Sequence, residues 1–132
     1  MTGGAAVRVV VVDDEPDICH LLGVQFRYLD GFEFVGSASD GSEIIELVDS
    51  ARADAVVMDL LMPGVNGFDA ISALREHKPD IGIVAYSGVA GDFVRQEMQR
   101  RGVELVLKSG DVRPLAEALR RSVARTPQRS PD

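Results

Sequence analysis

The sequence has a single cysteine, Cys19, so an internal disulfide cannot stabilise the fold. No apolar run approaches the ~20 residues that span a bilayer. The first residues, MTGGAAVR, contain no basic segment followed by a long apolar one, so we expect no secretory signal there. Positive charge is also scarce, and the net charge of −7 argues against nucleic-acid binding by this chain. These absences predict a cytoplasmic protein without membrane contact, in which Cys19 is a reduced, partly buried core residue.

The length of 132 residues fits one domain, and a hydrophobic content of 45% is enough for a core without disulfides. We expect residues 1–6 to be a disordered N-terminus and residues 7–125 to be the folded domain. The last seven residues, TPQRSPD at 126–132, are expected to form a disordered tail or the start of a linker.

Charge is distributed unevenly along the chain. Residues 1–66 carry 12 acidic and 3 basic side chains, whereas residues 67–132 carry 9 acidic and 11 basic ones. The arginine-rich second half is either a surface for a partner or a set of solvated helix faces, and the pattern favours neither interpretation.

Short apolar runs alternate with helix-like patterns five times. The runs predict strands at residues 7–12, 32–38, 55–58, 81–85 and 103–107. Pro16 suits the first turn of a helix whose apolar positions are Ile18, Leu21, Leu22, Phe26 and Leu29. The fourth helix, from about residue 90 to 101, is only weakly amphipathic. Strict alternation of this kind predicts right-handed crossovers and a parallel sheet with helices on both faces.

Polar groups follow four of the predicted strands. Asp13 and Asp14 follow the first, Asp59 the third, Ser87 the fourth and Lys108 the fifth. Because ligands bind at the carboxyl ends of strands in open α/β sheets, these groups are expected to share one site. Three carboxylates, a hydroxyl and an ammonium suit a divalent cation together with a phosphoryl group.

The expected chemistry follows from charge. Carboxylates brought together repel each other unless a cation intervenes, and Mg²⁺ prefers such oxygen ligands. Asp59 then fits a carboxylate nucleophile, a type of group that forms aspartyl-phosphates, with Lys108 neutralising charge. The simpler interpretations are that Asp13 and Asp14 cap the next helix, that Ser87 is a turn residue and that Lys108 is solvated.

With these residues placed, the chain resembles the receiver domain of two-component response regulators. The resemblance is carried by VVVVDDEPD at 9–17, MDLLMPGVNG at 58–67, SGVAG at 87–91 and the lysine of LVLKSG at 105–110. It implies a doubly wound, flavodoxin-like (βα)5 fold over residues 7–125. The implied parallel sheet has five strands in the order 2-1-3-4-5, with helices on both faces.

The resemblance also implies roles for individual residues. Asp59 would be the phosphoacceptor. Asp14 would bind Mg²⁺ directly and Asp13 directly or through water, with Asp59 and the main-chain carbonyl of Leu61 completing the protein ligands. The switch hydroxyl and the lysine that binds the phosphoryl group would be Ser87 and Lys108.

The resemblance implies that the phosphoryl donor is a sensor histidine kinase or a phosphotransfer protein. The chain itself would not be an enzyme, although it would assist its own phosphotransfer and dephosphorylation.

The output surface would comprise the fourth helix, the fifth strand and the fifth helix, with Arg95, Arg101, Leu105 and Arg113. It would bind an output domain or a second copy of the chain. Because Leu105 replaces a common aromatic residue, we expect this surface to respond by helix displacement. Both a stand-alone receiver and part of a longer regulator with a DNA-binding domain fit the resemblance.

Two alternatives compete with this interpretation. A phosphotransferase of the haloacid-dehalogenase kind also uses a nucleophilic aspartate and Mg²⁺, but it needs a second aspartate two residues later, where this chain has Glu15 after Asp13 and Leu61 after Asp59. The second alternative is a flavodoxin-like cofactor binder or a receiver-like scaffold that is never phosphorylated. The acidic first turn repels phosphate and lacks the glycine-rich cradle that such a cofactor needs.

Overall fold

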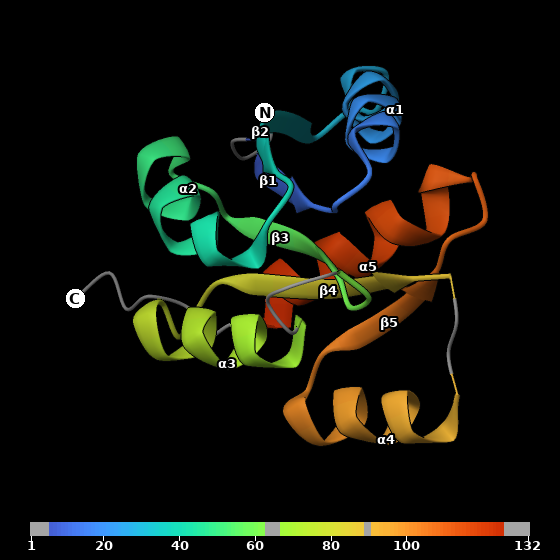
Figure 1. Ribbon diagram of the computed structural model, residues 1–132. Helices are drawn as coiled ribbons and strands as arrows, with labels where there is room; N and C mark the ends of the chain where they lie inside the picture. Colours follow the sequence, from blue (N-terminus) through green and yellow to red (C-terminus); the bar gives the residue numbers. More distant parts are fainter. Residues whose placement is uncertain (1–5, 63–66, 89–90, 126–132) are drawn as a thin grey trace.

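The computed structural model describes residues 6–62, 67–88 and 91–125. It contains one parallel sheet in the order β2-β1-β3-β4-β5 (Figure 1). The strands are β1 (Val7–Val12), β2 (Phe32–Ala38), β3 (Ala55–Asp59), β4 (Gly82–Ser87) and β5 (Glu104–Leu107). The helices are α1 (Pro16–Arg27), α2 (Ile44–Ala51), α3 (Gly67–His77), α4 (Asp92–Arg101) and α5 (Val112–Arg125), with a 3-10 turn (Gly41–Glu43) before α2. The predicted fold class and strand order are confirmed.

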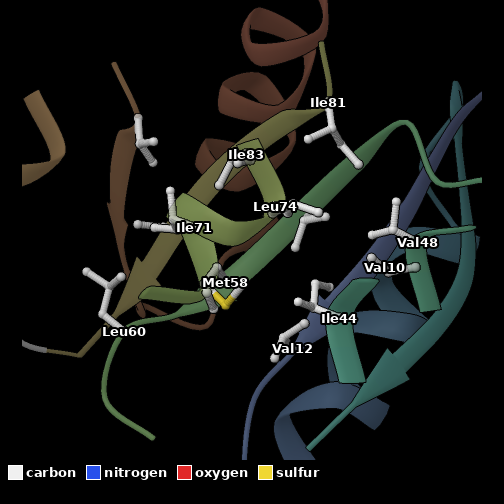
Figure 2. Close-up of a cluster of buried hydrophobic side chains, with 14 of the residues drawn as sticks. Val10, Val12, Ile44, Val48, Met58, Leu60, Ile71, Leu74, Ile81 and Ile83 are labelled. Atoms are coloured by element: carbon white, nitrogen blue, oxygen red, sulfur yellow. The ribbon is translucent and has the colours of Figure 1, made fainter. Parts of the chain in front are cut away.

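The sheet separates two apolar clusters. Side chains alternate across each strand, so Val10 and Val12 of β1 face one side while Val9 and Val11 face the other. Figure 2 shows the first cluster, where α2 and α3 cover β1 and β3 and Ile71 lies near Met58. The second cluster is covered by α1 and α5. Both faces of the sheet are therefore buried, as the continuous valine runs predict.

Several predicted boundaries are wrong by one or two residues. The third strand includes Asp59, and the fourth covers Gly82–Ser87 instead of residues 81–85. The fifth strand begins at Glu104, and the fourth helix begins at Asp92, because Gly91 has extended backbone as its N-cap. The predicted start of that helix at residue 90, the turn residues 63–66 and the termini at 1–5 and 126–132 lie outside the described residues.

The predicted apolar face of α1 is only partly correct. Cys19, Leu22 and Phe26 are buried, as expected, but Leu21 is 45% exposed because it points away from the sheet. Leu29 lies beyond the end of α1, although it still packs against the second apolar cluster. The expectation that Cys19 is a core residue is confirmed.

The strand register aligns the carboxyl ends of four strands. Val12 pairs with Met58, so Asp13 follows β1 at the level of Asp59. Asp59 in turn pairs with Tyr86, the residue before Ser87. Ser87 pairs with Leu107, which places Lys108 just beyond it. The polar groups that follow these strands consequently meet at one edge of the sheet.

Candidate functional site

Asp13 is the most deeply buried of the acidic residues at this edge, with 1% of its surface exposed. Its backbone N–H donates to Ala38 and so extends the pairing of β1 with β2. One carboxylate oxygen, Oδ1, accepts from the N–H of Glu15 at 2.9 Å, and the other, Oδ2, accepts from Lys108 Nζ at 2.8 Å. Glu15, not Asp13, is the N-cap of α1. The carboxylate of Asp13 therefore forms an ion pair with Lys108 in addition to accepting a hydrogen bond in the turn before α1. The simple capping interpretation does not explain this ion pair.

Asp59 ends β3 with only 3% of its surface exposed. Its Oδ1 accepts from the backbone N–H of Leu61 at 3.1 Å, and its Oδ2 lies 3.5 Å from Lys108 Nζ. Burial raises the pKa of Asp59 to about 6, and the negative charge of Asp13 adds to this, although the Leu61 N–H and Lys108 act in the opposite direction. At neutral pH Asp59 is therefore mainly an ionised carboxylate, held at an energetic cost.

Lys108 bridges two of the carboxylates, Asp13 and Asp59. Burial disfavours its charge, but the hydrogen bond to Asp13 and the charges of both carboxylates outweigh burial and raise the pKa of Lys108 above its ordinary value. The ammonium also lies 5.8 Å from the centre of the Tyr86 ring. Lys108 is thus a fixed positive charge inside the site, and the solvated-lysine interpretation is wrong.

Asp13, Asp14 and Asp59 form a candidate metal site. Each offers one carboxylate oxygen, and these oxygens lie within 4.8 Å of one another. Three carboxylates face one ammonium, so the cluster keeps an excess of negative charge in a largely buried place. An all-oxygen donor set with unbalanced negative charge fits Mg²⁺. The side chain of Leu61, the other expected ligand residue, is exposed, and its N–H is occupied by Asp59.

Ser87 is the last residue of β4 and is 1% exposed. Its carbonyl accepts from the N–H of Lys108 at 2.9 Å, so the two expected phosphate-binding residues are adjacent across β4 and β5. Ser87 belongs to the strand, which corrects its interpretation as a turn residue.

The sequence did not identify two residues that shape the site. Tyr86 lies beside Asp59 in the sheet and under Lys108, but a tyrosine near a strand end has no distinctive pattern. Gly67 begins α3 so close to the strand end that a Cβ there would lie 2.9 Å from Leu60 Cα and 3.0 Å from the carbonyl oxygen of Asp59. The motif at 58–67 contains Gly67, but a side chain is excluded there by the backbone of Leu60 and Asp59, which no sequence pattern reveals.

The expected output residues lie on α4, β5 and α5. Arg95 and Leu105 line a groove of about 360 Å³ between α4 and β5. Arg113 is exposed and pairs with Asp111 at 2.9 Å. Arg101 differs from the others, because its half-buried guanidinium donates hydrogen bonds to Phe68 and Ser72 of α3 instead of pointing toward the groove.

Comparison with known proteins agrees with this geometry. Residues 9–120 match the family described as "Response regulator receiver domain". The chain belongs to this family. The receiver is 36% identical over 119 residues to protein-glutamate methylesterase/protein-glutamine glutaminase 3 of Myxococcus xanthus, covering 87% of this chain and 33% of that protein. It is 30% identical over 115 residues to the response regulator GacA of Pseudomonas viridiflava, covering 86% of this chain and 54% of that protein.

Among solved structures, the receiver is similar to the response regulator protein TrrA from Thermotoga maritima, solved in complex with Mg²⁺-BeF. The TM-score is 0.74 and the identity 29%, covering 87% of this chain and 97% of that one. The receiver spans about a third to a half of the length of the two curated relatives named above. In the described part of the chain, no helix is long and apolar enough to cross a membrane. The family match supports neither a phosphotransferase of the haloacid-dehalogenase kind nor a flavodoxin-like cofactor binder.

Proposed function

We propose that this receiver accepts a phosphoryl group on Asp59 in a Mg²⁺-dependent reaction and passes the resulting change to a partner surface. The observation that carries the proposal is the convergence of Asp13, Asp14 and Asp59 around the ammonium of Lys108. The similarity to TrrA, whose structure holds Mg²⁺-BeF, supports the same chemistry at this edge.

Each residue has a defined task in this reaction. An oxygen of ionised Asp59 attacks phosphorus, forming a phosphorus–oxygen bond as the bond to the donor's leaving group breaks. Asp13, Asp14, Asp59 and the carbonyl of Leu61 would hold Mg²⁺, which would supply positive charge beside the transferring group. The hydrogen bond from Leu61 N–H fixes the orientation of the Asp59 carboxylate before attack. After transfer, Lys108 and the hydroxyl of Ser87 bind phosphoryl oxygens.

The biological setting is part of the same proposal. The phosphoryl donor is a sensor histidine kinase or a phosphotransfer protein, and the receiver acts in the cytoplasm over residues 7–125. The face formed by α4, β5 and α5, with Arg95, Leu105 and Arg113, contacts an output domain or a second copy of the chain. The receiver has no enzymatic activity on external substrates.

Treatment with acetyl phosphate or phosphoramidate in Mg²⁺ should add one phosphate to the chain, as measured by intact mass. The Asp59→Asn variant and excess chelator should both abolish the modification, because the first removes the nucleophile and the second the cation. Asp69→Asn, which changes an exposed aspartate at the start of α3, is the matched control and should be modified normally. Modification that persists in Asp59→Asn would contradict the assignment.

Millimolar Mg²⁺ should stabilise the folded receiver. At a tenfold excess over the dissociation constant, binding to the folded state contributes about 1.4 kcal/mol, which raises Tm by about 5 °C. Thermal melts with and without Mg²⁺ measure the shift. Asp14→Ala should abolish it, whereas Asp17→Ala, which removes an exposed carboxylate from the first turn of α1, should keep it. Equal shifts in wild type and Asp14→Ala would show that the ion binds elsewhere.

A further inference from the structure

Helix α4 is weakly attached to the core. Met98 is its only buried residue, and Phe93, its largest apolar side chain, is 67% exposed. The helix lies at the edge of the molecule, below β5 in Figure 1. Its other apolar contacts are those of the partly buried Val94 and the edge-on contact of the Phe93 ring with Phe68 of α3, at 6.1 Å between ring centres. With so few apolar contacts, the position of α4 depends also on its polar contacts with neighbouring elements.

Arg101 makes a polar contact between α4 and α3. Its Nη1 donates to the carbonyl of Phe68 at 3.1 Å and to Ser72 Oγ at 2.7 Å. The guanidinium also lies 5.5 Å from the centre of the Phe68 ring. In return, Arg75 of α3 donates to the backbone carbonyl of Arg101 at 3.1 Å. The two helices are therefore joined by arginine contacts in both directions. The contacts of Arg101 involve the first turn of α3.

That first turn rests directly on the backbone of the phosphoacceptor. Gly67 approaches Leu60 so closely that a Cβ would meet the Leu60 Cα at 2.9 Å. The Asp59 carboxylate in turn holds the Leu61 N–H. A change of charge at Asp59 that moves this backbone must also move Gly67, because the contact leaves no free space, and with it the adjacent Phe68.

We propose that Arg101 is a positioning residue that couples α4 to the phosphorylation state of Asp59 through the first turn of α3. The inference rests on the proposed phosphorylation of Asp59. The route runs from Asp59 through the Leu60 backbone, Gly67 and Phe68 to Arg101. It needs no aromatic side chain at Leu105, and it assigns Arg101 to the inside of the switch instead of its output surface.

Hydrogen exchange of α4 amides tests the coupling, measured on the full chain in Mg²⁺ with and without beryllofluoride. In wild type, exchange in residues 92–101 should differ between the two states. In Arg101→Ala, α4 should exchange about tenfold faster without beryllofluoride, because a charge-assisted hydrogen bond is lost, and the response of α4 to beryllofluoride should disappear. Ser72→Ala, which removes one acceptor, should weaken the response even if Arg101→Ala folds poorly.

Arg100→Ala is the matched control. Arg100 is the preceding residue and shares Glu97 with Arg101, but its side chain is 76% exposed and, within the part of the chain that the structure describes, forms an ion pair only inside α4. This variant should respond like wild type. A normal α4 response in Arg101→Ala, or an equal loss in Arg100→Ala, would overturn the coupling. The mass measurement on Asp59 is independent, so a phosphorylated wild type whose α4 does not respond refutes only this inference.

Discussion

Replacing Lys108 with methionine should lower the free energy of unfolding by about 3 kcal/mol in metal-free buffer at neutral pH. The ammonium is the positive charge that bridges Asp13 and Asp59, which are 1% and 3% exposed. Removing it leaves two buried like charges without a counter-ion, and methionine keeps the apolar length of the side chain. Urea denaturation in the presence of chelator measures the loss.

Lys78→Met is the matched control, since Lys78 is the only other lysine in the sequence. Among the described residues, its Nζ makes only a long hydrogen bond of 3.4 Å to the Ala53 carbonyl, so its replacement should cost less than about 1 kcal/mol. Millimolar Mg²⁺ should restore much of the stability of Lys108→Met, because a divalent ion can neutralise the same carboxylates. Equal losses in the two variants would show that Lys108 contributes only ordinary packing.

The strand order followed from the resemblance to receiver domains, whereas the strands and the polar residues at their carboxyl ends could be located from local patterns. A valine run followed by acidic residues marks the end of β1 whatever surrounds it, and the same reasoning applies to Asp59 and Lys108. The prediction for β4 was less accurate because the run was ended at its last aliphatic residue. Tyr86 and Ser87 continue the strand since they pair with Asp59 and Leu107, and such pairing is not visible in one strand's composition.

The contacts between helices could not be predicted. Arg101 has the pattern of a solvated arginine near a helix end, and nothing in its neighbours distinguishes it from Arg100. Consecutive residues of a helix point in different directions, so the packing of α4 against α3 directs Arg101 toward Ser72 and leaves Arg100 exposed. The exposure of Leu21 has a similar cause, because the sheet selects which part of the broad apolar face of α1 becomes buried.

Asp59→Asn should stabilise the metal-free receiver relative to wild type, and the gain should grow as the pH rises. Burial, the largest cause, raises the pKa of Asp59 from its ordinary value of 3.8 to about 6. Between these values the folded state binds more protons than the unfolded state, so the free energy of unfolding of wild type falls as the pH increases. Stability from this group is complete below pH 3.8 and lost above pH 6. The asparagine variant does not titrate, and its advantage should increase by about 2–3 kcal/mol between pH 4 and pH 7.

Urea titrations of both proteins in chelator, at several values between pH 4 and pH 7, measure this difference directly. Asp111→Asn provides a control of opposite sign. The hydrogen bonds from Arg113 hold the pKa of Asp111 below its usual value. The free energy of unfolding of wild type should therefore increase relative to that of Asp111→Asn as the pH rises. A difference between wild type and Asp59→Asn that stays constant with pH would show that the Asp59 carboxylate titrates as it does in the unfolded chain. The site would then impose no electrostatic cost for a cation or a phosphoryl group to relieve.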